Sequence, residues 1–163
     1  MIRLITTFFG TGLLPKAPGT WGSLAAIPVA WVIHGLSGFP GLLAATVLAF
    51  LLGWWAIGRD TAGKENHDPS EIVIDEVVGI WIALLPLSYG MWANDQPAWL
   101  FPYPGWITAF IFFRLFDIWK PGPVGWADRQ HTPLGVILDD VIAGVLASLF
   151  VIGGAGIYHG LIQ

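Results

Sequence analysis

The chain has 163 residues, of which 55% are hydrophobic and 11% charged, and its mean hydropathy is +0.69. Soluble domains carry roughly 25% charged residues, so this composition excludes an ordinary soluble domain and predicts a single membrane-embedded domain over residues 1–163. The formal net charge of −4 excludes a basic surface for nucleic acid, and the absence of cysteine excludes disulfides, thiolate metal sites and cysteine nucleophiles.

The first residues are predicted to form an interfacial segment, Ile2–Phe9, followed by a glycine-rich loop over 10–23. Glycines in such a loop let backbone amides approach an anion closely. Thr20 or Ser23 is placed to cap the helix that follows. A plain turn with a helix cap explains the same residues, and both interpretations stay open at this point.

Five apolar runs follow, each long enough or nearly long enough to cross a bilayer as a helix. They are Trp21–Leu36, Phe39–Gly58, Val77–Ala93, Pro97–Phe113 and Val141–Tyr158. About 20 apolar residues cross the hydrocarbon core, so we predict an all-α, polytopic membrane helical bundle of about five spans. Trp21–Leu36 is the shortest run, and a re-entrant course for it stays open.

The basic residues predict the orientation of these spans. All seven Lys and Arg fall before the first span, around the polar loop Arg59–Glu71, or from the end of the fourth span into the loop after it. The segments 34–40, 88–98 and 158–163 contain none. Five crossings therefore place every basic residue on one face, which is expected to be cytoplasmic. Of the eleven acidic residues only Asp95 falls on the other face.

Charged side chains recur at one end of three predicted spans. They are Asp75 with Glu76, Arg114 with Asp117, and Asp139 with Asp140. Ionised groups cost roughly 2.5–3.5 kcal/mol each toward the bilayer centre, so we expect these residues to line a polar site. For a single pair such as Arg114 and Asp117, a salt bridge on one helix face is the simpler explanation. Three acidic clusters on one face favour a shared site.

The residue types indicate the chemistry of that site. Several neighbouring carboxylates cannot all stay ionised unless a cation lies among them. Oxygen ligands without cysteine favour a hard cation, Mg²⁺ before Zn²⁺. Arg114, Lys120 and Arg129 are donors that a phosphate needs beside a metal. This combination suggests phosphoryl chemistry on a lipid. The histidines have no metal-motif spacing and stay unassigned: His34, His67, His131 and His159.

Four stretches carry a more specific pattern. They are LLPKAPGTWGSLAAIP (13–28), DPSEIVIDEVVGIWIAL (68–84), FRLFDIWKPGP (113–123) and GVILDDVIAGVLAS (135–148). In this order the chain resembles the phosphatidylglycerophosphatase A family of bacterial membrane lipid phosphatases. The resemblance implies Mg²⁺-dependent hydrolysis of phosphatidylglycerophosphate to phosphatidylglycerol and inorganic phosphate. With the orientation above, the active site is expected on the cytoplasmic side of a bacterial inner membrane.

The family's charged motif positions correspond to a defined set of residues here. They are Glu71, Asp75, Glu76, Arg114, Asp117, Lys120, Asp139 and Asp140. Glu71, Asp75, Glu76, Asp139 and Asp140 are the expected Mg²⁺ ligands. We expect Asp117 to be a further ligand or the general base, and Arg114 and Lys120 to hold the phosphate. The 10–23 loop is expected to close over it through Lys16, Thr20 and Ser23. The nucleophile, water or a carboxylate, stays open, as does the oligomeric state.

Two other functions fit parts of the pattern. A divalent-cation transporter also places carboxylates on its helices, but near the midplane of the membrane and with access from both faces. The carboxylates here fall at one end of their spans, and the sequence shows no inverted repeat. A lipid head-group transferase needs a nucleotide-lipid signature that we do not find.

Overall fold

The computed structural model describes residues 1–64 and 68–162, and every regular element in those ranges is helical. The elements are α1 (Ile2–Thr6), the 3-10 turn η1 (Thr11–Leu13), α2 (Pro18–Asp60), α3 (Ile74–Ala93), α4 (Tyr103–Trp119), α5 (Pro123–Asp128) and α6 (Pro133–Ile162). The all-α prediction is confirmed. His67 lies outside the described residues.

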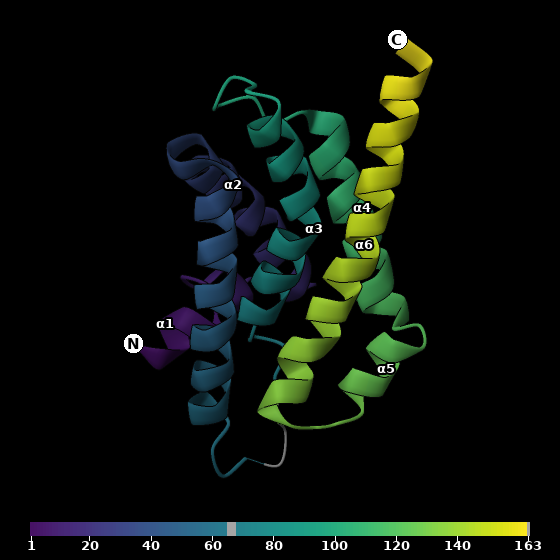
Figure 1. Cartoon of the computed structure of the whole chain (residues 1–163). Coiled ribbons are helices and arrows are strands. Elements are labelled where there is room, and N and C mark those ends of the chain that lie inside the picture. The colour runs from purple at the N-terminus through teal and green to yellow at the C-terminus, as the bar shows by residue number, and fades with distance from the viewer. Residues whose placement is uncertain (65–67, 163) are drawn as a thin grey trace.

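Helix α2 consists of two arms that meet at Gly38, where φ of 63° and ψ of −162° interrupt the helix. Gly22 in the first arm and Gly53 in the second both pack against the Val73–Ile74 start of α3. Gly38 instead packs against Trp92 at the far end of α3. The arms 18–37 and 39–60 therefore run in opposite directions along the bundle (Figure 1).

Within residues 1–64 and 68–162, three helices are long and apolar enough to span a membrane. They are α2, α3 and the Pro133–Ile157 part of α6. Helix α2 accounts for two of the predicted runs, and the 17 residues of α4 extend about 26 Å at 1.5 Å per residue. Helix length and composition thus identify three spanning helices, fewer than the five crossings that the sequence predicts.

The predicted start of the fourth run is wrong. Helix α4 begins at Tyr103 and not at Pro97, so the helix lies about six residues later than expected. Pro102 precedes the helix in an extended conformation, and Pro104 follows at one of its first two positions. Proline lacks an N–H and disfavours helical geometry in the residue before it, so it is tolerated mainly in the first turn of a helix.

The last helix starts earlier than predicted. Helix α6 begins at Pro133, eight residues before Val141. The Gly135 N–H donates a hydrogen bond of 3.0 Å to Thr132 Oγ1, which caps the helix. The acidic pair Asp139–Asp140 therefore lies inside α6, where the helix fixes the direction of each side chain.

Helix α3 occupies the centre of the bundle and packs against α2, α4 and α6 (Figure 1). Its closest neighbour is α6, because both helices have glycine where they cross. A Cβ atom on Gly144 would collide with the Gly79 carbonyl oxygen, and one on Gly79 would lie 2.7 Å from the Asp140 carbonyl oxygen. The backbones are in direct contact, as small residues allow in membrane helices. Both helices begin at the same end of the bundle (Figure 1).

The crossing predicts the effect of one added methyl group. Gly144→Ala should destabilise the protein by roughly 1–3 kcal/mol, because the group that it meets is backbone, which cannot rotate away. The measurement is the Tm of the detergent-purified protein. Gly154→Ala is the control on the same helix, because its Cβ meets no described atom of another segment within 4 Å. Equal Tm values for the two variants would contradict a backbone contact at Gly144.

Candidate functional site

Three carboxylates meet at the end of the bundle where α3 and α6 begin. Asp75, Glu76 and Asp140 each place an oxygen within 4.8 Å of the other two. Asp75 is 5% exposed and Asp140 is 3% exposed. Asp75 Oδ1, Glu76 Oε2 and Asp140 Oδ1 have no hydrogen-bond partner among the described residues. Buried oxygens that face one another without donors are the ligands that a hard divalent cation takes, so the residues fit such an ion.

The helix crossing explains why these side chains meet. Asp75 lies four residues before Gly79, and Asp140 lies four residues before Gly144. A spacing of four is about one helical turn, so each aspartate lies on the same face as the glycine that follows it. Because the two helices run in the same direction and touch at their glycines, both aspartates lie one turn from the contact and face each other.

Arg114 from α4 lies beside the carboxylates. Its Nη1 is 2.6 Å from Asp117 Oδ2, and both side chains are about 15% exposed. This contact is an ion pair without hydrogen-bond alignment, and Arg114 Nε and Nη1 have no hydrogen-bond partner in the described part of the chain. The expected pairing of Arg114 with Asp117 is therefore present. It leaves buried guanidinium donors for a further acceptor, which an anionic ligand supplies.

Gly19 brings the first turn of α2 to the same place. A Cβ atom there would collide with Glu76 Oε1 and lie 3.1 Å from Arg114 Nη1. Lys16 and Ala17 precede the helix at φ of 61° and 51°, in the left-handed region that residues with a Cβ atom rarely adopt. The chain thus turns sharply into α2 at the point where its backbone meets the carboxylates.

The loop residues expected to bind substrate differ in position. Lys16 is exposed and Thr20 is half-buried. Ser23 is buried, and its hydroxyl donates a hydrogen bond of 2.7 Å to the Gly19 carbonyl. The prediction that Thr20 or Ser23 caps the helix is wrong, because α2 begins earlier, after Ala17, and has no side-chain cap.

Lys120 is bound by two carboxylates. Its Nζ lies 2.8 Å from Asp139 Oδ2 and also contacts Asp128 Oδ1. Burial lowers the pKa of Lys120, but the hydrogen bonds to Asp128 and Asp139 outweigh it and the net shift is upward. Lys120 therefore stays charged and joins the end of α4 to α5 and α6. Asp139 Oδ1 accepts a hydrogen bond of 3.0 Å from the Asp140 N–H.

Two acidic residues that the sequence analysis left unassigned lie around this lysine. Asp128 is eight residues from Lys120, beyond a proline- and glycine-rich turn, so no helical spacing connects the pair in the sequence. The pKa of Asp68 is raised, mainly because the protein displaces water around it. Lys120 lowers that pKa, and Asp128 and Asp117 raise it. The loop before α3 thus adds another acidic group to the site.

Glu71 lies apart from the three-carboxylate cluster. Its Oε1 forms a 3.1 Å ion pair with Arg3 Nη2, and the two side chains are 42% and 64% exposed. The Glu71 carbonyl oxygen packs against Gly12, where a Cβ atom would collide with it. These contacts tie α1 and η1 to the loop that precedes α3.

Known proteins resemble the chain over most of its length. The family model described as phosphatidylglycerophosphatase A matches residues 4–155. Phosphatidylglycerophosphatase A of Escherichia coli is 35% identical over 155 residues, which are 93% of this chain and 83% of that protein. The Haemophilus influenzae protein of the same name is 37% identical, over 92% of this chain and 86% of that protein.

A third relative carries a different name. The putative phosphatidylinositol-3-phosphatase of Bacteroides thetaiotaomicron is 38% identical over 152 residues, which are 91% of this chain and 89% of that protein. No solved structure matches the chain.

The three-carboxylate cluster predicts how a cation affects stability. Mg²⁺ should raise the Tm of the parent protein, because an ion that binds only the folded state stabilises it. Asp140→Asn should lose this response, yet melt no lower than the parent in EDTA, because it removes repulsion among the carboxylates. Glu71→Gln is the control and should respond to Mg²⁺ like the parent, since Glu71 pairs with Arg3. A full Mg²⁺ response in Asp140→Asn would exclude this cluster as the cation site.

Proposed function

The chain belongs to the phosphatidylglycerophosphatase A family and is a phosphatase for a lipid phosphate monoester, and from this premise we propose that it uses Mg²⁺ to hydrolyse phosphatidylglycerophosphate to phosphatidylglycerol and inorganic phosphate. One observation carries the proposal. Three carboxylate oxygens of Asp75, Glu76 and Asp140 that have no hydrogen-bond partner among the described residues lie beside guanidinium donors of Arg114 that likewise have none there. An acidic pocket for a cation next to donors for an anion suits a phosphate that a divalent ion accompanies.

In this proposal Asp75, Glu76 and Asp140 hold the ion. When bound, Mg²⁺ supplies Lewis-acid stabilisation of the charge that develops on the phosphoryl oxygens. The Asp139 carboxylate is fixed beside them, because its Oδ1 accepts from the Asp140 N–H and its Oδ2 accepts from Lys120 Nζ. Glu71 is left out of the ligand set because it pairs with Arg3 at the surface.

Arg114 and Asp117 act on the phosphate side. The planar guanidinium donates hydrogen bonds to the phosphoryl oxygens, and its ion pair with Asp117 fixes its position. We assign Asp117 as the general base that takes a proton from the water that attacks phosphorus. Asp117 then returns this proton to the glycerol oxygen as its bond to phosphorus breaks. Lys120, already bound by Asp128 and Asp139, positions these carboxylates. The first turn of α2 borders the phosphate at Gly19.

We further propose five crossings, with the two arms of α2 counted separately and α4 included. The arms run in opposite directions, and α3, α4 and α6 follow as successive passes (Figure 1). All seven Lys and Arg then lie on the side of the carboxylates, which the positive-inside rule assigns to the cytoplasm. The site faces the inner leaflet of the bacterial inner membrane, where a headgroup reaches it while the acyl chains stay in the bilayer.

A divalent-cation transporter is the alternative, and the helix crossing argues against it. Transport requires a path from both faces of the membrane. The backbones of α3 and α6 touch at Gly79 and Gly144, one turn beyond the carboxylates, which closes the route between these two helices. The arrangement suits a site that opens at one end only.

Phosphate release from defined lipids tests the function. Purified protein with Mg²⁺ should release inorganic phosphate from phosphatidylglycerophosphate faster than from phosphatidylinositol 3-phosphate with the same acyl chains. The second lipid is included because one relative is named as a putative phosphatase for it. Faster release from the inositol lipid would move the proposed substrate to that class. Release from neither lipid in the presence of Mg²⁺ would contradict the proposal.

Substitution of Arg114 separates phosphate binding from a structural ion pair. Arg114→Lys keeps the charge but loses the planar fork, so it should fold and melt nearly like the parent. It should lose about 2–4 kcal/mol of transition-state stabilisation, or about 30- to 1,000-fold in kcat/KM. The Mg²⁺ requirement should change little. If the ion pair alone matters, Arg114→Ala/Asp117→Ala should recover the activity lost in Arg114→Ala. That recovery would overturn the assignment.

Single cysteines test the five crossings, because the parent has none. Ser37→Cys and Asn94→Cys should react with a membrane-impermeant maleimide added to intact cells. Lys64→Cys and Gln130→Cys should react only after the membrane is permeabilised. The measurement is mass-tag labelling of each variant. Labelling of position 64 in intact cells would contradict the proposed topology.

A further inference from the structure

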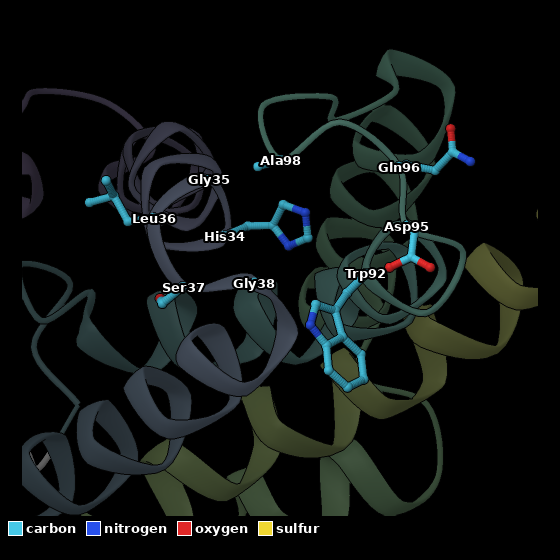
Figure 2. Close-up of a pocket in the computed structure, with 9 residues that line it drawn as sticks. All are labelled: His34, Gly35, Leu36, Ser37, Gly38, Trp92, Asp95, Gln96 and Ala98. Atoms are coloured by element: carbon cyan, nitrogen blue, oxygen red, sulfur yellow. The ribbon is translucent and has the colours of Figure 1, made fainter.

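A second polar pocket lies at the end of the bundle opposite the carboxylates. It has a volume of about 310 Å³ and lies between residues 34–38 of α2 and the end of α3 with the loop that follows (Figure 2). The two walls are held together where Gly38 packs against Trp92. None of the residues that line it belongs to the carboxylate site, so the phosphatase reaction leaves this pocket unexplained.

His34 is the buried polar group of this pocket. Its side chain is 3% exposed, and its Nδ1 lies 2.7 Å from Ser88 Oγ. This contact has two possible forms: Ser88 Oγ–H donates to Nδ1 and Nε2 carries the imidazole proton, or Nδ1–H donates to Ser88 Oγ. Figure 2 shows the ring directed into the pocket. A buried imidazole whose Nδ1 is already hydrogen-bonded therefore faces the cavity.

Asp95 and Trp92 give the pocket groups that attract a cation. Asp95 is exposed at the turn after α3, and it has no ion pair within the described residues. The segments 34–40 and 88–98 contain no Lys or Arg that would neutralise it. Trp92 lines the same pocket as Asp95 (Figure 2). A carboxylate next to an indole is a combination that recognises an organic ammonium group.

Aromatic side chains lie at and next to the pocket: Trp92 lines it, Trp99 packs against Gly35 of its wall, and Tyr89 neighbours Trp92. Tyr89, Trp92 and Trp99 are each about half exposed. Trp31 and Trp99 form an edge-to-face pair with ring centroids 5.4 Å apart, and the Trp31 Nε1–H donates a hydrogen bond of 2.9 Å to the Trp99 carbonyl. Half-exposed Trp and Tyr are typical of the depth of lipid headgroups. These residues therefore indicate that the pocket lies at the depth of the lipid headgroups.

We propose that this pocket binds a zwitterionic lipid headgroup, a primary ammonium joined to a phosphate diester, from the leaflet opposite the catalytic site. Asp95 and Trp92 bind the ammonium group. With Nδ1 accepting from Ser88, the His34 ring donates its Nε2–H to the phosphate. The cavity volume lies at the lower end of the roughly 300–1,000 Å³ that is common for ligand sites. The bound lipid holds the bend of α2 against the end of α3, independently of the phosphatase reaction.

Native mass spectrometry of the full chain in detergent tests the proposal. It compares the binding of dioleoyl phosphatidylethanolamine with that of its N-acetyl derivative, which lacks the ammonium group. The parent should bind the ethanolamine lipid at least about tenfold more tightly. Asp95→Asn should lose this preference, and Asp95→Glu should keep most of it. Asp60→Asn, the same change at the other end of the bundle, is the control and should bind like the parent. Phosphate release by Asp95→Asn should equal that of the parent.

His34→Gln should weaken the binding of both lipids. If His34→Gln fails to fold, the Asp95 variants still test the proposal, because Asp95 is exposed. Millimolar glycerophosphoethanolamine should compete with the lipid, because the pocket is proposed to bind the headgroup and this compound carries the same headgroup. Absence of competition, or equal binding of the two lipids by the parent, would overturn the proposal. Zn²⁺ binding that is lost in both Asp95→Asn and His34→Gln would replace the headgroup with a metal ion and would overturn it equally.

Discussion

The backbone contact between Gly79 and Gly144 determines where the functional groups of this protein lie. Without side chains at these positions α3 and α6 approach until their backbones touch, and the parallel direction of the helices then brings Asp75 and Asp140 together. The same end of α3 carries its acidic residues in the first helical turn, where the helix dipole favours negative charge. The first turn of α2 reaches Glu76 at Gly19 and adds the positive end of a second dipole.

This arrangement has an energetic cost that a bound cation and anion would remove. Three buried carboxylate oxygens and two guanidinium nitrogens lack hydrogen-bond partners in the described chain. Each buried polar group left without a partner costs about 1–3 kcal/mol, and charged groups cost more. No other buried side-chain nitrogen or oxygen of the described residues lacks a partner: the Trp81 indole donates to the Ala26 carbonyl, and the Thr46 hydroxyl donates to the Leu42 carbonyl. The unsatisfied groups are concentrated where phosphate and cation are proposed to bind.

Composition and charge position predicted much of this from the sequence. The helical class is confirmed, and the charges at three span ends do converge. Periodicity could not show which of the adjacent residues Asp139 and Asp140 faces Asp75, because neighbours on a helix point about 100° apart and only the packing of α6 decides. Periodicity also could not predict the contact between Lys120 and Asp128, because this contact depends on the left-handed backbone conformation of Lys120. The helix starts were misplaced where proline or a threonine cap, and not hydropathy, sets the boundary.

The bend at Gly38 has a consequence for biogenesis. Because the two arms of α2 are joined without a loop, the chain is suited to enter the bilayer as a closed helical hairpin. In the proposed topology only the segment around the bend has to be translocated, and residues 34–40 carry no Lys, Arg, Asp or Glu. Charged side chains make translocation expensive, so this hairpin crosses at low cost. The first third of the protein can therefore be integrated before the ribosome has made the acidic helices that complete the site.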